Sequence, residues 1–493
     1  MYPREIPVAC VQVVAHDRND FARAWPHLLA AVDDACAGGA KLVVLPEGSV
    51  PGYVLGSEPV SSEQLSDARA DLAARARRHA ATIVYGAAKI VGDRTYNAAI
   101  VLGPDGRELG YAAKQFLWHF DRRWYAAGET LEPIATPLGN LGLLICADGR
   151  IPTIAATLCD RGAELLVMPT AWVTSGRDPL AFENIQADFI ASIRARENGV
   201  PFVAANKVGV ERASVAYCGK SAIFDADGAT IARGDETHPS IVRGNVVVGG
   251  RTRPARRNFA PASPAIIETF APPPSRRLRV AFTCASDEAT IERHVGHAAD
   301  ADADVLIARG TATTERSERG MTVAVVARHD AIIDVAGLRI ANLDAATLTS
   351  PRALVGARLA GIDCFIWHAG QDDAATVAFA RSRAAELRAY VLVFASDERS
   401  YIVDPDGAVA AGTFARYTLA AFVYDPARTA ATTVAPTTDV LAGLRTAERI
   451  AADPLAHRDA SQLRHFVPAT TEALMPRTRL HSTSSRERAR STD

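Results

Sequence analysis

The first half of the chain alternates short apolar runs with segments whose apolar residues recur at helical spacing. Residues 6–14 are rich in apolar and β-branched side chains, residues 21–37 carry apolar residues three to four positions apart, and residues 41–45 read KLVVL. This succession predicts a strand, a helix and a second strand, which together form a parallel βαβ unit. Glu47 stands at the carboxyl end of that second strand.

The same alternation continues to about residue 233. It predicts helices over residues 63–79, 154–161 and 181–198, and strands over residues 82–90, 96–102, 107–114, 141–145, 164–168, 201–206, 221–224 and 229–233. The DADG turn between the last two strands predicts a hairpin. This order favours an α/β layer fold in which helices flank two sheets.

A weak internal repeat follows the proline-rich residues 254–276. RVAFTC (279–284) resembles VACVQV near the N-terminus, and DPDG (404–407) resembles DADG (225–228). The repeat carries a large deletion after Gly310. We therefore expect domains over residues 1–270 and 271–454, and a disordered tail over the Ser- and Arg-rich residues 455–493.

Composition narrows the class of protein. A hydrophobic content of 48% and a net charge of −2 are ordinary for a globular protein and give no reason to expect nucleic acid as a partner. No window approaches an uncharged apolar run long enough to span a membrane, and the N-terminus lacks the layout of a signal peptide. Seven widely spaced cysteines without a CxxC pair predict neither a disulfide framework nor a zinc site. We expect a cytoplasmic protein.

Three chemically useful side chains follow predicted strands: Glu47, Lys114 and Cys146. Taken one at a time, they are best interpreted as a surface carboxylate, a surface amine and a buried core thiol without a catalytic role. The carboxyl ends of parallel strands meet at one edge of a sheet, however, so the three groups can come together. A carboxylate can then take the thiol proton, while the ammonium and the backbone N–H of Ala147 stabilise an oxyanion.

Six motifs then occur in a fixed order: PEGSVPGY (46–53), YAAK (111–114), CADGRIP (146–152), GAELLVMPTAW (162–172), RAREN (194–198) and GKSAIFDADG (219–228). This series resembles the nitrilase superfamily of carbon–nitrogen hydrolases over about residues 5–250. The resemblance implies an αββα sandwich, repeated here in tandem with a shorter degenerate second copy. It also implies a catalytic triad of Glu47, Lys114 and Cys146 that needs no metal or other cofactor.

The resemblance also implies supporting residues. Tyr53 and Trp172 stand in positions expected to bind substrate. The family's second glutamate corresponds to Asp121, which is one methylene shorter and leaves its contact with Lys114 open.

Residues around the cysteine favour one branch of the family. Relatives that act on nitriles usually have Trp-Glu after the cysteine, whereas this chain has Asp148, Arg150 and Pro152, as amidases and carbamoylases do. FDRRWYAAG (120–128) also resembles a carbamoylase pattern. The expected activity is hydrolysis of a small amide or N-carbamoyl compound through a cysteine thioester.

Three other functions stay open. Nitrile hydrolysis would use the same triad. A glutamine amidotransferase subunit would need a synthetase domain with a nucleotide loop, which the second half lacks. A non-catalytic scaffold or binding protein would make no use of Glu47, Lys114 and Cys146.

The second repeat has lost the triad. Arg309 stands in the place of Glu47, Ala345 lies 199 residues after Cys146, and the region of Lys114 falls in the deletion. Members of the family pair as dimers through one face of the sandwich, so this half is expected to mimic a partner as an internal pseudo-dimer. Further homo-oligomerisation, and an independent domain with its own site, stay open.

Overall fold

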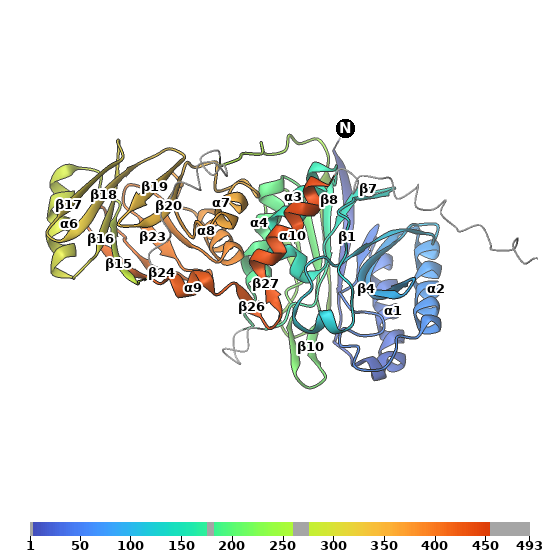
Figure 1. The fold of residues 1–493 in the computed structure, drawn as a ribbon. Helices are drawn as coiled ribbons and strands as arrows, with labels where there is room; N and C mark the ends of the chain where they lie inside the picture. Colours follow the sequence, from blue (N-terminus) through green and yellow to red (C-terminus); the bar gives the residue numbers. More distant parts are fainter. Residues whose placement is uncertain (1–2, 175–181, 260–275, 454–493) are drawn as a thin grey trace, which may run out of the picture. The chain divides into compact units, whose positions relative to one another are not determined.

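Two six-stranded sheets lie face to face in the first half of the chain (Figure 1). The computed structural model describes residues 3–174, 182–259 and 276–453. In the first sheet the order is β14-β1-β2-β3-β4-β5, with bounds Ser240–Val248 (β14), Arg4–Gln12 (β1), Leu42–Val44 (β2), Thr82–Val91 (β3), Arg94–Leu102 (β4) and Glu108–Ala113 (β5). Strands β1, β2 and β3 are parallel, so their carboxyl ends share one edge.

The second sheet has the order β13-β12-β9-β8-β7-β6, with bounds Thr230–Arg233 (β13), Ala222–Phe224 (β12), Phe202–Ala205 (β9), Leu165–Pro169 (β8), Gly139–Leu143 (β7) and Ile134–Thr136 (β6). Its central strands β7, β8 and β9 are also parallel. A separate hairpin joins Val208–Glu211 (β10) to Val215–Cys218 (β11).

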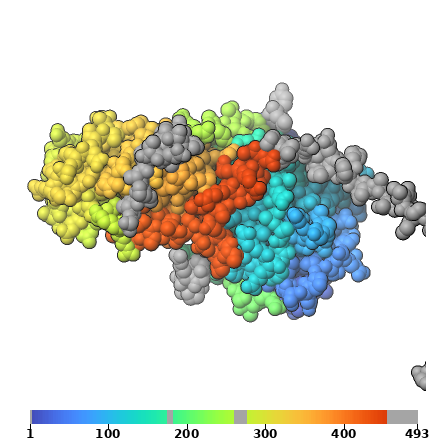
Figure 2. Space-filling model, viewed as in Figure 1, coloured from blue at the N-terminus to red at the C-terminus, as the bar shows by residue number. Residues whose placement is uncertain are grey.

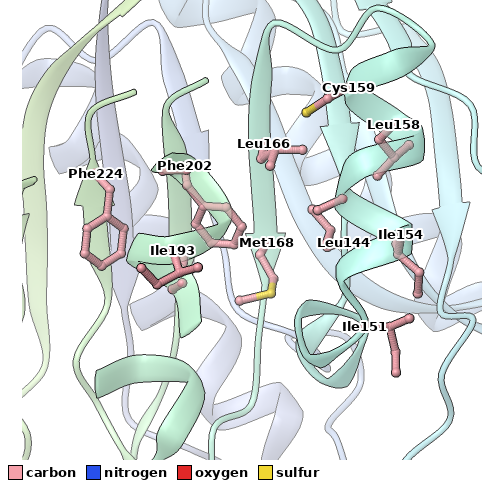
Figure 3. Packing of buried hydrophobic residues seen from close by; sticks show 14 of the residues in the cluster. Leu144, Ile151, Ile154, Leu158, Cys159, Leu166, Met168, Ile193, Phe202 and Phe224 are labelled. Atoms are coloured by element: carbon pink, nitrogen blue, oxygen red, sulfur yellow. The ribbon is translucent and has the colours of Figure 1, made fainter. Parts of the chain in front are cut away.

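Helices cover the outer faces of both sheets. Phe21–Ala37 (α1) and Ser62–His79 (α2) pack on the first sheet, and Pro152–Asp160 (α3) and Ala191–Asn198 (α4) on the second. Figure 3 shows Ile193 of α4 beside Phe202 of β9. Full burial of such a side chain contributes about 1.5–3 kcal/mol to folding. The apolar faces of the helices therefore hold them against the outer faces of the sheets. Short 3₁₀ turns occupy Arg18–Asp20, His119–Arg123 and Cys146–Arg150.

The second half repeats this layout. Its first sheet has the order β17-β18-β16-β15-β25, with bounds Thr314–Glu318 (β17), Met321–Ala327 (β18), Val305–Gly310 (β16), Leu278–Thr283 (β15) and Ala420–Tyr424 (β25). Its second sheet has the order β19-β20-β21-β22-β23-β24, with bounds Ala331–Val335 (β19), Leu338–Leu343 (β20), Cys364–His368 (β21), Tyr390–Phe394 (β22), Ser400–Val403 (β23) and Val409–Gly412 (β24).

Helices and a small hairpin complete this half: Glu288–Asp300 (α6), Val355–Leu359 (α7), Ala374–Leu387 (α8), Pro426–Ala430 (α9), Thr433–Ala435 (β26), Thr438–Asp439 (β27) and Val440–Ala452 (α10). Helix α6 packs on the first sheet of this half, and α8 on the second. Both halves are therefore αββα sandwiches, as predicted.

Strand pairing shows how closely the two copies correspond. Leu141 pairs with Leu165 between β7 and β8, and the residues 199 positions later, Ile340 and Cys364, pair between β20 and β21. Between β16 and β18 the described chain holds β17 and no helix like α2, and no strand stands in the place of β5. The second copy is thus shorter and has no counterpart of the strand that precedes Lys114.

The two copies pack against each other through their helices. One hydrophobic cluster contains Ile154 of α3 together with Phe379 of α8 and Leu444 of α10. Figure 2 shows the red segment that contains α10 bordering the cyan surface of the first copy. Glu448 of α10 accepts a hydrogen bond from Thr153 of α3 at 2.6 Å. The second copy therefore covers the helical face next to the Cys146 turn.

Most predicted elements differ from the observed ones by one or two residues at an end, and for two of them the structure shows the reason. The helix expected over residues 181–198 begins with a π-helical turn, Gln186–Ile190, because the side chain of Asn184 accepts hydrogen bonds from the backbone N–H of Gln186 and Ala187; residue 181 lies outside the described residues. The strand expected over residues 141–145 ends at Leu143. There the N–H of Ile145 donates to the Asp148 carboxylate at 3.0 Å instead of to a neighbouring strand.

Strands β14 and β10–β11 were not predicted from the hydrophobic pattern. The predicted tail, residues 455–493, lies outside the described residues. No helix in the described part of the chain is long and apolar enough to cross a membrane.

Candidate functional site

Glu47 and Lys114 meet in the core of the first copy. Glu47 follows β2 and Lys114 follows β5, and both side chains are fully buried. The Lys114 ammonium donates to Glu47 Oε1 at 2.8 Å. Glu47 Oε2 is buried and has no hydrogen-bond partner among the described residues. One oxygen of this carboxylate is therefore held by hydrogen bonds, and the other has none among the described residues.

Asp121 is the second carboxylate on Lys114. Its Oδ2 accepts from Lys114 Nζ at 2.6 Å and from the backbone N–H of Trp118 at 3.0 Å. The 3₁₀ turn His119–Arg123 brings the carboxylate close, which compensates for the shorter side chain. Burial by itself lowers the pKa of Lys114, but Asp121 and Glu47 outweigh it and hold that pKa well above its usual range. The ammonium stays charged, and an ammonium has a third N–H to donate.

Cys146 opens the 3₁₀ turn that follows β7. It is 6% exposed and has φ of +47°, a conformation that costs about 1–3 kcal/mol for a residue with a Cβ. Burial, reinforced by the Glu47 carboxylate, raises the pKa of the thiol to about 12, and Lys114 opposes that rise. The cysteine is therefore a thiol at neutral pH and needs a base to become a nucleophile.

Asp148 ties the cysteine turn to the lysine loop. Its Oδ1 accepts from the backbone N–H of Gln115 at 3.0 Å and of Phe116 at 2.7 Å, and its Oδ2 accepts from Ile145 N–H. Burial raises the pKa of Asp148 to about 7 in spite of these donors. The carboxylate that marks the amide branch in the sequence thus fixes the spacing of the Lys114 and Cys146 loops.

A cavity of about 410 Å³ opens onto Cys146. Its lining includes Ala147 and both residues expected to bind substrate, Tyr53 and Trp172. The other aromatic and larger polar residues that line the cavity are Trp118, His119, Phe120, Arg150, Asn184 and Gln186. The lining combines aromatic rings with polar side chains that can orient a ligand, which is typical of a small-molecule site.

Three buried polar groups of residues that line this cavity lack protein partners. The indole N–H of Trp172, the Nε of Arg150 and the Oε1 of Gln186 form no hydrogen bond among the described residues. The Arg150 guanidinium lies 4.8 Å from the Trp118 ring, and burial lowers its pKa to about 10, so it remains a cation. Arg150 gives the cavity a positive charge.

Sequence reasoning missed Asn97, which donates to Glu47 Oε1 at 2.6 Å. The sequence did offer a sign of this contact. Asn97 is a polar residue within the apolar strand β4, and a buried polar side chain needs a hydrogen-bond partner. Sequence reasoning also missed the buried pair of Lys207 and Glu211, in which the Glu211 carboxylate accepts from the backbone N–H of Tyr53 at 3.0 Å. Among the described residues no group of His, Cys, Asp and Glu side chains is arranged to hold a metal ion.

Comparison with known proteins agrees with this geometry. The model of the carbon–nitrogen hydrolase family matches residues 7–250. A relative described as "Hydrolase in pqqF 5'region" of Pseudomonas protegens is 34% identical over 206 residues, which cover 40% of this chain and 68% of that protein. The chain belongs to the carbon–nitrogen hydrolase family.

Two further relatives of this carbon–nitrogen hydrolase carry names of activities. An (R)-stereoselective amidase of a Pseudomonas species is 29% identical over 45% of this chain and 79% of its own length. A nitrilase of Pyrococcus abyssi is 30% identical over 43% of this chain and 78% of its own length. Two other relatives are matched over only 57% and 50% of their length. The match to the family model, residues 7–250, ends before the second copy begins.

Proposed function

We propose that this carbon–nitrogen hydrolase cleaves a small amide or N-carbamoyl compound through a thioester on Cys146. The observation that supports it is the free Oε2 of Glu47, buried beside Lys114 and electrostatically coupled to the Cys146 thiol at the cavity. A thiol with a pKa of about 12 needs such a base. Tyr53 and Trp172 are proposed to hold the substrate.

In the first step Cys146 Sγ attacks the carbonyl carbon while Glu47 takes the thiol proton. The carbonyl π electrons move to oxygen, and the third N–H of Lys114 and the backbone N–H of Ala147 stabilise that oxyanion. When the oxyanion collapses, the C–N bond breaks and the nitrogen takes the proton from Glu47. Ammonia or an amine leaves, and the acyl group stays on sulfur.

In the second step Glu47 takes a proton from water, and the hydroxide attacks the thioester carbon. Collapse breaks the C–S bond, the acid leaves, and the sulfur takes back its proton from Glu47. The carboxylate of Asp121 keeps Lys114 charged and pointed at Glu47 throughout, so it acts as a positioning residue.

Nitriles are the second candidate substrate, because one relative is named a nitrilase. The amide is preferred because Asp148, in the place where nitrile-acting relatives usually have glutamate, is held by three backbone N–H groups. It therefore organises loops and does not face a substrate.

Intact-protein mass spectrometry after incubation with amides, N-carbamoyl compounds and nitriles tests the proposal. We expect an acyl adduct on Cys146 and acid formation from an amide or carbamoyl compound. The Cys146→Ala variant should keep its fold and lose both. Turnover by that variant would disprove the mechanism, and acid formation from nitriles alone would select the second candidate. A substrate bound but never turned over would favour a scaffold or binding protein.

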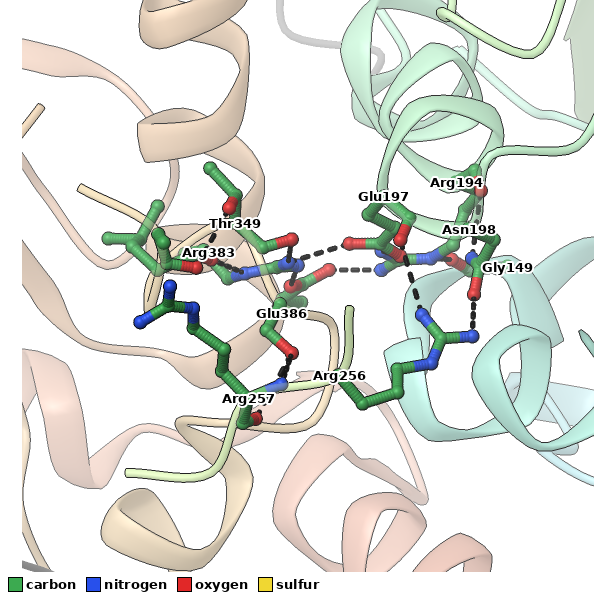
Figure 4. A network of polar contacts seen from close by, with 12 residues as sticks. Gly149, Arg194, Glu197, Asn198, Arg256, Arg257, Thr349, Arg383 and Glu386 are labelled. Carbon is green, nitrogen blue, oxygen red and sulfur yellow. Dashed lines mark hydrogen bonds and ion pairs between the residues drawn. The ribbon is translucent and has the colours of Figure 1, made fainter. Parts of the chain in front are cut away.

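We also infer that the second copy replaces a partner subunit, which would make the chain an internal pseudo-dimer. Figure 4 shows the support: Arg194 and Glu197 of α4 and Arg383 and Glu386 of α8 form one buried ring of ion pairs. The pairs are related by a shift of 189 positions, so the copies present the same groups to each other. Domains over residues 1–270 and 271–454 agree with β14 ending at Val248 and β15 starting at Leu278.

A further inference from the structure

A cavity of about 730 Å³ occupies the second copy at the place that corresponds to the catalytic centre of the first. Arg309 is near the end of β16, the counterpart of β2, and His368 is the last residue of β21, the counterpart of β8. Arg328 follows β18 directly. All three line the cavity. The carboxyl ends of parallel strands are where α/β sheets bind ligands, so losing the triad did not remove the geometry of a binding site.

The two arginines give this cavity positive charge. No described residue forms an ion pair or a hydrogen bond with the exposed Arg328 guanidinium. Arg309 pairs with Asp397, whose side chain is 80% exposed. Asp397 and the exposed Glu398 also line the cavity. An exposed carboxylate holds an arginine weakly, so an incoming anion can replace Asp397 on Arg309.

His368 adds a hydrogen-bond acceptor. Its side chain is 3% exposed, and its Nε2 lies 3.0 Å from Asn342 Oδ1. The amide of Asn342 donates to the carbonyls of Ala327 and His329, which fixes its oxygen toward the histidine. Nε2 must then carry the proton. Burial, together with Arg309 and Arg328, lowers the pKa of His368 to about 4, so the ring is neutral and Nδ1 is a lone-pair acceptor without a partner.

We propose that this cavity binds a small oxyanion that also carries an O–H or N–H donor, such as hydrogen phosphate or a hydroxycarboxylate. The planar forks of Arg309 and Arg328 hold the charged oxygens, because guanidinium matches carboxylate and phosphate geometry. Nδ1 of His368 accepts from the donor. The volume leaves room for an organic group attached to the anion. The second copy is then a ligand-binding module as well as a structural partner.

Isothermal titration of the full-length protein with four anions tests the proposal. Phosphate and lactate carry the donor at neutral pH, whereas sulfate and acetate are matched anions without it. We expect phosphate to bind at least about tenfold more tightly than sulfate. Sulfate has no O–H to donate, so its binding would leave the buried Nδ1 of His368 without a hydrogen bond. The lactate and acetate pair shows whether a carboxylate serves equally well. Sulfate binding equal to phosphate overturns the role of His368, and no binding of any anion at millimolar concentration overturns the site.

Substitutions locate the binding. Arg328→Gln and Arg309→Gln should each weaken phosphate binding at least about tenfold, since each removes a charged hydrogen bond. Arg319→Gln, at an exposed arginine elsewhere in the second copy, should leave it unchanged. Arg150→Gln, in the catalytic cavity, should also leave it unchanged. Binding lost in the Arg150 variant, or kept in both the Arg309 and Arg328 variants, contradicts the proposal.

Discussion

The guanidinium of Arg194 in the first copy donates to the carboxylate of Glu386 in the second, 192 positions away in the chain. Both side chains are fully buried. The same guanidinium donates through Nε to the carbonyl of Gly149 at 2.9 Å, inside the Cys146–Arg150 turn. A residue of the copy without a triad therefore helps to hold the turn that carries the proposed nucleophile (Figure 4).

Glu386→Gln should lower the free energy of unfolding by about 3–5 kcal/mol, because it leaves buried arginine charge without a full partner. It should also lower kcat with little change in KM, since the Gly149 carbonyl loses a fixed donor. Denaturant unfolding and steady-state kinetics measure both. Glu318→Gln, which breaks a partly exposed pair with Arg316, should change stability by no more than about 0.5 kcal/mol. Equal effects of the two substitutions would show that the buried ring has no special role.

Glu47→Gln should keep the hydrogen bonds from Lys114 and Asn97, because the amide oxygen can replace Oε1. It removes the proposed base, so kcat should fall by about 10²–10⁴-fold. Acid release measures the rate, and circular dichroism checks the fold. Glu108→Gln, which breaks a partly exposed pair with Lys89 in the same sheet, is the matched control. A well-folded Glu47 variant with normal kcat would assign the base to another group.

Arg150→Gln should raise KM for an amide that carries a carboxylate by about tenfold or more, since a hydrogen bond to a charged group contributes about 1.5–3 kcal/mol. An uncharged amide of the same size should keep its KM. Arg107→Gln, at an exposed arginine outside the cavity, should affect neither. Equal loss with both substrates would mean that Arg150 supports the cavity wall and does not recognise charge.

His16 should make the fold sensitive to mild acid. Burial, followed by the charge of Lys207, lowers its pKa from 6.5 to about 4. Below pH 6.5 His16 is protonated in the unfolded chain but stays neutral in the folded chain. The free energy of unfolding therefore falls as the pH drops toward 4. The loss from this group approaches about 3 kcal/mol. His368 has the same lowered pKa, so His16→Gln should make the curve of unfolding free energy shallower over that range without flattening it. An unchanged curve would show that other groups dominate.

Local patterns determined much of this protein. Helix α1 spans residues 21–37 as the spacing predicted, because its apolar residues face the sheet at helical periodicity. The DADG turn gave the β12–β13 hairpin. The strand-end positions of Glu47, Lys114 and Cys146 suggested one sheet edge, but the strands that they follow belong to two facing sheets. The helix and the hairpin depend on residues close in sequence, so the chain itself reveals them.

Contacts between distant residues could be decided only by the tertiary structure. The close approach of Asp121 to Lys114 depends on a 3₁₀ turn whose hydrogen bonds no periodicity encodes. Asn97 reaches Glu47 across 50 positions, and Arg194 reaches Glu386 across 192. Such pairs form because buried charges need partners, and which partner is near depends on how the sheets and helices pack.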